Sequence, residues 1–277
     1  MSLPGSVRAR RSAPALVRWA AVDRCRPRHW TALALASSAV ACSGPLDLGS
    51  DLIWFAENEG ADTAEWSADA AGGLVPGSSG SSAAISNREA HGGAQSLLLV
   101  TPANGEDSGA RLYRSVPLAS EAYYSAWYLI PESYVTRSYF TIMKFHSQDP
   151  GDEQLHDRGI DINVRDLSDG RYVLYVLHHD GAFLQPPLAL PTPIVPVGRW
   201  FHVEVFFRAT LDATGRISVW LDGRPIYDLG ARPTLVREAA YFSVCNLLRE
   251  AQPANVELFV DDVAVSRSRV TENGILR

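Results

Sequence analysis

Cysteine, lysine and long apolar runs are all scarce in this sequence. The three cysteines, Cys25, Cys42 and Cys245, cannot build a disulfide framework, so a stable fold needs a large apolar core, and 46% of the residues are hydrophobic. The short apolar run from Trp30 to Ala41 cannot span a bilayer. No ten-residue window shows a helical period, which argues against a helical fold.

Acidic residues outnumber basic ones in residues 42–277 taken together, whereas basic residues dominate the first 41. The whole chain carries a formal charge of −6, and residues 1–41 hold seven arginines against one aspartate, which leaves −12 for residues 42–277. Because phosphate contacts need a basic surface, this balance excludes nucleic acid as a general partner. Positive charge comes almost entirely from arginine, and Lys144 is the only lysine.

The arginine-rich head and the apolar run after it are typical of an export signal. The run ends Ala39-Val-Ala-Cys42-Ser-Gly, which resembles a bacterial lipobox, although Ala39 stands where leucine is usual. The resemblance implies that residues 1–41 are a signal peptide, that Cys42 is lipidated, and that residues 42–50 form a tether at the outer membrane or cell surface. A plain secretory signal is the alternative. Cys245 then has no partner and is expected to be an inert buried thiol.

Short alternating stretches separated by turn residues fill the chain after residue 50. Asp222-Gly223, for example, is a two-residue hairpin signal. The spacing predicts an all-β fold, a two-sheet antiparallel jelly-roll sandwich of residues 51–268, followed by a C-terminal tail of residues 269–277. The expected strands are 52–57, 83–88, 95–101, 110–116, 122–130, 139–146, 160–165, 172–179, 200–208, 216–221, 225–229, 240–247 and 256–266.

The stretch from Tyr139 to Gln148 brings an amine, an imidazole and an amide to one side of a strand. Strict alternation predicts one face made of Phe140, Ile142, Lys144, His146 and Gln148, and an opposite face made of Thr141, Met143, Phe145 and Ser147.

The two stretches that follow continue this polar face. Asp161, Asn163 and Arg165 alternate with apolar residues. In the next strand Tyr175 and His179 share one side and His178 lies on the other, and the sequence leaves open which side joins the polar face. Three neighbouring antiparallel strands would gather these groups within the reach of one sugar. The plain alternative is a solvated outer face, on which these side chains have no ligand.

Several stretches resemble concanavalin-A-like jelly rolls and carbohydrate-binding modules. They are Trp54-Phe-Ala-Glu-Asn-Glu-Gly-Ala-Asp62, His91-Gly-Gly and Glu257-Leu-Phe-Val-Asp261-Asp-Val. Val197-Gly-Arg-Trp200-Phe-His-Val-Glu204 and Val219-Trp-Leu-Asp-Gly223 resemble the central strands of laminin-G-like and heparin-lyase-like polysaccharide lyase domains. In such modules an early acidic residue and the aspartate of the last strand often hold a structural Ca²⁺, which here implies Glu59 and Asp261.

The lyase resemblance implies β-elimination on a uronate polymer, with Tyr and His as base and acid and with cationic or amide groups that neutralise the sugar carboxylate. The residues with these roles are, as catalytic groups, His146, Tyr175 and His179, and, as substrate-binding groups, Lys144, Gln148, Asn163 and Arg165. The expected partner is a polysaccharide, and the protein is expected to be a monomer.

Two other functions stay open at the level of sequence. A flat aromatic platform would favour a non-catalytic glycan-binding lipoprotein, and the absence of any sugar site would favour an adhesive or structural one. Trp200 and Trp220 are expected in the core, whereas one aromatic pair of the 122–130 strand could stack on a sugar. No pair of closely spaced catalytic carboxylates resembles a glycosidase signature.

Overall fold

The computed structural model describes residues 51–66, 80–102, 108–114, 116–134, 136, 139–146, 159–178, 183–184, 192–236, 240–248, 255–271 and 274–275. These residues form two antiparallel sheets, one of eight strands and one of seven, together with a separate pair of short strands. Apart from one 3-10 turn, Ala64–Trp66, this part of the chain has no helix. It also contains no helix long and apolar enough to cross a membrane.

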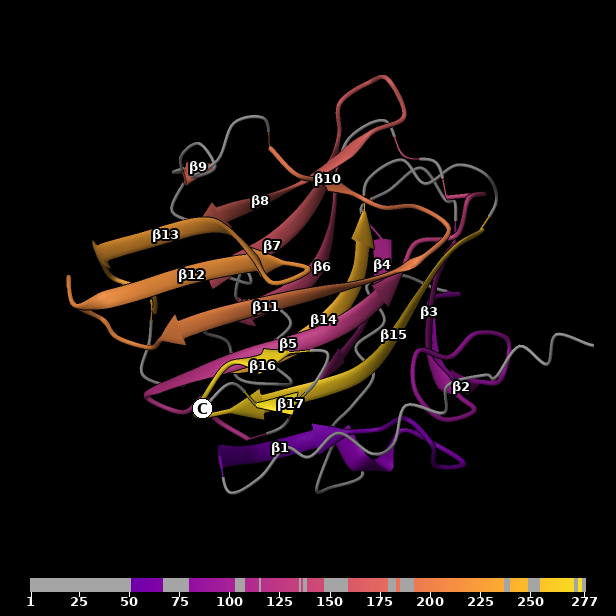
Figure 1. The fold of residues 1–277 in the computed structure, drawn as a ribbon, viewed down its shortest axis with the longest axis horizontal. Coiled ribbons are helices and arrows are strands. Elements are labelled where there is room, and N and C mark those ends of the chain that lie inside the picture. Colours follow the sequence, from indigo (N-terminus) through magenta and orange to yellow (C-terminus); the bar gives the residue numbers. More distant parts are fainter. Residues whose placement is uncertain are drawn as a thin grey trace, which may run out of the picture. The chain divides into compact units, whose positions relative to one another are not determined.

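The eight-stranded sheet has the order β13-β12-β11-β5-β15-β3-β2, and β1 also pairs with β15. Its strands are β1 (Leu52–Ala56), β2 (Ser82–Ser86), β3 (Ser96–Pro102), β5 (Glu121–Leu129), β11 (Trp200–Arg208), β12 (Gly215–Leu221), β13 (Arg224–Arg232) and β15 (Asn255–Ser266). Figure 1 shows β13, β12, β11, β5 and β15 as one twisted layer in front of the second sheet.

The seven-stranded sheet has the order β10-β8-β7-β6-β14-β4, with β9 on β8. Its strands are β4 (Ser108–Tyr113), β6 (Tyr139–His146), β7 (Gly159–Asp166), β8 (Tyr172–His178), β9 (Phe183–Leu184), β10 (Ile194–Val195) and β14 (Tyr241–Leu248). The remaining pair is β16 (Val270–Thr271) with β17 (Gly274–Ile275). The prediction of an all-β, two-sheet antiparallel sandwich is therefore confirmed.

The core lies between the two sheets and is rich in aromatic rings. Phe145 of β6 stacks on Phe207 of β11, with 4.2 Å between ring centroids, and Tyr124 of β5 meets Phe145 edge to face at 5.0 Å. Tyr128 of β5 donates its hydroxyl proton to the carbonyl oxygen of Ile142, 3.1 Å away in the other sheet. Each fully buried large side chain stabilises the folded state by about 1.5–3 kcal/mol. Such contacts can therefore stabilise the fold without disulfides.

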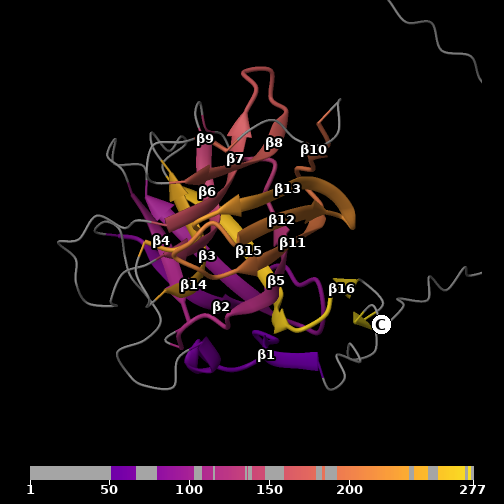
Figure 2. The ribbon, with the colours of Figure 1, turned by 90° about the vertical axis from the view of Figure 1, so that its left-hand side faces the viewer.

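The segment after β15 folds back onto the outer face of the eight-stranded sheet. Glu204 of β11 is fully buried there and accepts hydrogen bonds from Arg269 Nε at 2.5 Å and from the Val270 backbone N–H at 2.7 Å. Figure 2 shows β16 on the side of β5 and β11 that faces away from β6 and β14. The expected boundary between domain and tail at residue 268 falls within this packed segment.

Candidate functional site

The polar side chains of the seven-stranded sheet lie in rows that cross neighbouring strands. One row contains Thr141, Asn163 and Tyr175, because these residues pair across β6, β7 and β8. A second row contains Lys144, paired with Asp161 on β7 and with Ser243 on β14. A third contains His146 and Tyr241. The opposite side of β7 carries Ile160, Ile162 and Val164, which all lie in the core.

A β-bulge in β6 corrects the predicted alternation of this strand. Thr141 pairs with Asn163 and Met143 with Ile162, so Ile142 is an extra residue with no partner on β7. Strict alternation put Thr141 on the face opposite Lys144, and this was wrong, because a bulge reverses the alternation after it. Phe140, Ile142, Met143 and Phe145 all pack in the core instead.

This polar face is buried. Lys144 is 4% exposed, His146 2%, Asp161 3% and Asn163 0%, which contradicts the alternative of a solvated outer face for these four residues. Lys144 Nζ lies 3.5 Å from Asp161 Oδ1. A buried ion pair costs desolvation energy that apolar residues of the same size would not cost, and groups of this kind cluster at functional sites.

Asn163 carries an unused hydrogen-bond donor on this face. Its Oδ1 accepts the hydroxyl proton of Thr141 at 2.7 Å, so the amide nitrogen points away from Thr141. Among the described residues Nδ2 has no hydrogen-bond partner, although Asn163 is fully buried. Leaving a buried N–H group unpaired costs about 1–3 kcal/mol, which a carboxylate or hydroxyl of a ligand would recover.

Tyr175 lies directly opposite Asn163 and is the phenol nearest to the amide in the sheet register. Its ring meets that of Tyr139 edge to face at 5.7 Å. Burial raises the pKa of Tyr175, and the neighbouring Tyr139 and Asp161 raise it further, while Arg165 lowers it. The phenol is therefore protonated at neutral pH and can donate a hydrogen bond.

The imidazole of His146 lies near two tyrosines that the sequence did not single out. Tyr113 of β4 meets it edge to face with ring centroids 6.5 Å apart, and Tyr241 of β14 lies at 6.0 Å. Arg111, two residues before Tyr113, lies on the same side of β4 and pairs with Cys245. Cys245 is buried as expected, and burial raises the pKa of its thiol to about 12.

The structure brings together only some of the predicted residues. Lys144, Asn163 and Tyr175 occupy adjacent rows, and His146 follows Lys144 on the same side of β6, about 7 Å further along. His146 and Tyr175 are two strands and four residues apart, a separation of about 17 Å between Cα atoms.

The other predicted site residues lie at the margin, on the opposite face or outside the described chain. Arg165 is exposed at the end of β7. His178 pairs with Ile160 and shares its apolar side, so it does not join the polar face. Gln148 and His179 lie outside the described residues, and their roles stay predictions.

The two predicted calcium ligands hold a turn through hydrogen bonds. Asp261 Oδ2 accepts the backbone N–H groups of His91 and Gly92 at 2.8 and 3.1 Å. Glu59 Oε1 accepts those of Ala94 and Gln95 at 2.8 and 2.9 Å. No group of three or more His, Cys, Asp or Glu in the described chain is arranged to hold a metal ion. These carboxylates therefore fit N–H donors better than a cation, and Ca²⁺ stays an untested prediction.

Solved structures of several polysaccharide lyases resemble this fold. An endo-β-1,4-glucuronan lyase from the fungus Trichoderma reesei matches with a TM-score of 0.54 and 15% identity, over 70% of this chain and 90% of that chain. A double mutant of the alginate lyase Aly36B in complex with an alginate trisaccharide matches with a TM-score of 0.52 and 12% identity, over 71% and 88% of the two chains. No family model and no curated protein matches the sequence. The likeness confirms that this chain shares the jelly-roll fold of polysaccharide lyases, and identity this low shows the fold alone.

Proposed function

We propose that this protein is an exported polysaccharide lyase that cleaves a uronate-containing polymer by β-elimination. The observation that carries the proposal is the buried, unpaired Nδ2 donor of Asn163, which has Lys144 and Tyr175 in adjacent positions. An amide donor beside an ammonium group is suited to bind a carboxylate, and the half-buried phenol of Tyr175, protonated at neutral pH, can hydrogen-bond to the glycosidic oxygen and pass its proton to that oxygen as negative charge develops there.

In the proposed reaction, Asn163 and Lys144 neutralise the carboxylate of the sugar whose C5 proton is removed. Their hydrogen bonds and charge stabilise the negative charge that develops when that proton leaves. The C4–O bond then breaks, a double bond forms between C4 and C5, and Tyr175 donates its proton to the departing glycosidic oxygen. The C5 proton passes to a base beside that sugar other than His146, which lies about 17 Å from Tyr175 between Cα atoms, too far for both side chains to reach neighbouring atoms of one sugar.

The structural neighbours support the substrate class. Two of them are a glucuronan lyase and an alginate lyase in complex with an alginate trisaccharide, and both polymers consist of uronates. The sequence supports export and a lipid anchor at Cys42, which lies outside the described residues. Mass spectrometry of the mature protein tests the anchor, since an unmodified N-terminus, or one at another residue, would contradict it.

Incubation with a panel of uronate polymers, followed by the ultraviolet absorbance of the unsaturated product, tests the reaction. We expect Lys144→Ala, Asn163→Leu and Tyr175→Phe each to lower the rate by at least about 100-fold, because charge-stabilising and proton-transfer groups each contribute on that scale. Arg208→Ala is the matched control, because it removes an exposed arginine from the other sheet.

His146→Ala tests whether His146 takes part in the reaction. Full activity is expected, because His146 is too far from Tyr175 to act on the same sugar, and a loss of activity in a folded variant would contradict that argument while the elimination itself stands. If no polymer gives an unsaturated product but Lys144→Ala weakens glycan binding, the glycan-binding function replaces the lyase.

A further inference from the structure

The outer face of the eight-stranded sheet, opposite the polar face of the other sheet, carries a row of aromatic residues. Tyr124 and Tyr128 of β5 point into the core, which leaves Tyr123 and Trp127 on the outer side. The aromatic residues of this outer face on β5, β11 and β12 are Tyr123, Trp127, Trp200, Phe206 and Trp220. All five are partly exposed, so the prediction that Trp200 and Trp220 belong to the core was wrong.

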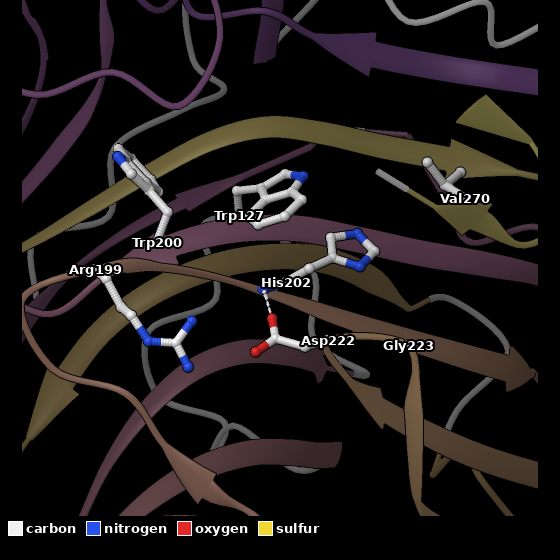
Figure 3. Close-up of a pocket in the computed structure, with 7 residues that line it drawn as sticks. All are labelled: Trp127, Arg199, Trp200, His202, Asp222, Gly223 and Val270. Atoms are coloured by element: carbon white, nitrogen blue, oxygen red, sulfur yellow. Dashed lines mark hydrogen bonds between the residues drawn. The ribbon is translucent and has the colours of Figure 1, made fainter. Parts of the chain in front are cut away.

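Part of this aromatic face forms a pocket of about 340 Å³. Its lining residues are Trp127, Arg199, Trp200, His202, Asp222, Gly223 and Val270. Figure 3 shows the rings of Trp127, Trp200 and His202 in the upper part of the pocket and the charged groups of Arg199 and Asp222 below them. The pocket therefore combines flat apolar surfaces with a few polar groups, which is the usual composition of a small-molecule site.

Neighbouring groups hold the walls of this pocket in place. The imidazole of His91 stacks on Trp127 with 3.7 Å between ring centroids, and its Nδ1 lies 2.6 Å from Asp262 Oδ2. Asp222 Oδ1 accepts the His202 backbone N–H at 2.8 Å, and the Asp222 N–H donates to the His202 carbonyl oxygen at 2.9 Å. The rings are already held in place before a ligand binds, so less conformational entropy is lost on binding.

The polar groups of the pocket define the charge of its ligand. Burial lowers the pKa of His202 to about 3, and the nearby His91 and Arg269 lower it further, so its imidazole is neutral and can exchange hydrogen bonds with hydroxyl groups. Asp222 uses one carboxylate oxygen within the protein. Arg199 is exposed at the rim, and its planar guanidinium group is suited to a bidentate carboxylate.

We propose that this pocket is a second carbohydrate-binding site, which takes one or two residues of a carboxylated sugar chain on the outer sheet. The indole of Trp200 supplies a flat surface for a sugar ring, Trp127 adds apolar contact although His91 covers one of its faces, His202 contacts hydroxyl groups, and Arg199 binds the carboxylate. The site needs no turnover. Its ligand class is that of the proposed substrate, so it would hold a polymer while a distant part of the same chain reaches the polar face.

Calorimetric titration with a β-1,4-linked glucuronate tetrasaccharide tests this proposal in the Lys144→Ala background, which blocks turnover and weakens the first site. We expect one remaining site, and both Arg199→Gln and Trp200→Ala should weaken it by about ten-fold or more, because a hydrogen bond to a charged group contributes on that scale. Arg208→Gln, an exposed arginine at the other end of β11, should leave it unchanged. Neutral cellotetraose should bind at least about ten-fold more weakly.

Tryptophan fluorescence shows whether the ligand reaches the pocket, and circular dichroism shows whether each variant is folded. Unchanged affinity in folded Arg199→Gln and Trp200→Ala proteins would overturn the proposal, and so would equal affinity for the neutral tetrasaccharide. The outcome is separate from that of the proposed lyase function. If the tetrasaccharide binds in a way that depends on Arg199 but no polymer is cleaved, the second site is supported and the lyase function is refuted. If a polymer is cleaved but no such binding is found, only the second site is refuted.

Discussion

Asp261 is expected to make the fold less stable as the pH rises from mildly acidic to neutral. The side chain is fully buried, and burial, followed by the negative charge of Asp262, raises its pKa from the ordinary 3.8 to about 7. Backbone N–H groups that donate to both of its oxygens lower the pKa but do not outweigh burial.

The sign of the effect follows from proton binding in the two states. Between about pH 4 and pH 7 the folded protein holds a proton on Asp261, whereas the unfolded chain has lost it, so raising the pH favours unfolding. Each pKa unit corresponds to about 1.4 kcal/mol, and a shift of roughly three units gives a loss of about 4 kcal/mol in the free energy of unfolding. The stabilisation is complete below the unfolded pKa and is lost once the pH exceeds 7.

Urea denaturation of the wild type and of Asp261→Asn, at unit steps between about pH 4 and 8, measures this contribution. The amide cannot ionise, so the wild-type advantage over the variant should shrink by about 4 kcal/mol across the range. A constant offset of about 1 kcal/mol is expected from one lost N–H acceptor. Asp228→Asn is the control, because Arg216 lowers the pKa of Asp228. The difference in the free energy of unfolding between the wild type and Asp228→Asn should therefore change only weakly with pH, and it should grow rather than shrink as the pH rises. A difference between wild type and Asp261→Asn that does not vary with pH would refute the reasoning.

Three further predictions concern the same molecule. Thr141→Val keeps the shape of the side chain but removes the donor to Asn163, so it should lower the free energy of unfolding by about 1–2 kcal/mol. It should also raise KM for the uronate polymer, because Asn163 is then free to turn away from the ligand, and an unchanged KM would contradict this role of Thr141. Arg269→Ala leaves the buried Glu204 without its cation and should cost about 2–3 kcal/mol, against less than about 0.5 for the exposed Arg208→Ala. If Ca²⁺ binds at Asp261, excess Ca²⁺ should raise the thermal midpoint at pH 8 relative to a chelator, and no difference would exclude that site.

The sequence was a good guide to which residues form strands and a poorer guide to how they face. The long strands were found because alternation of apolar and polar residues reports a half-buried sheet. It also gave the correct face for β7, where the pattern runs without interruption. It failed in β6, because a bulge at Ile142 depends on how two neighbouring strands pair, and that pairing is absent from the pattern of a single strand.

The neighbours of His146 illustrate a second limit. Tyr113 and Tyr241 belong to strands that were expected from the sequence, yet nothing local shows that β4 and β14 lie beside β6. Sheet order is set by packing over long sequence separations. Trp200 and Trp220 were assigned to the wrong face for a related reason, since a large indole is equally compatible with a core and with a covered outer face.

Because of its bulge, β6 can lose one residue without a change in the direction in which its polar side chains point. Because Ile142 is the residue without a partner on β7, deleting it would leave Thr141, Lys144 and His146 on the face they occupy now. Removing Phe145 instead would turn His146 toward the core. Related chains can therefore differ by one residue here and present the same polar groups, and an alignment that allows no gap within strands would match those groups to residues of the opposite face.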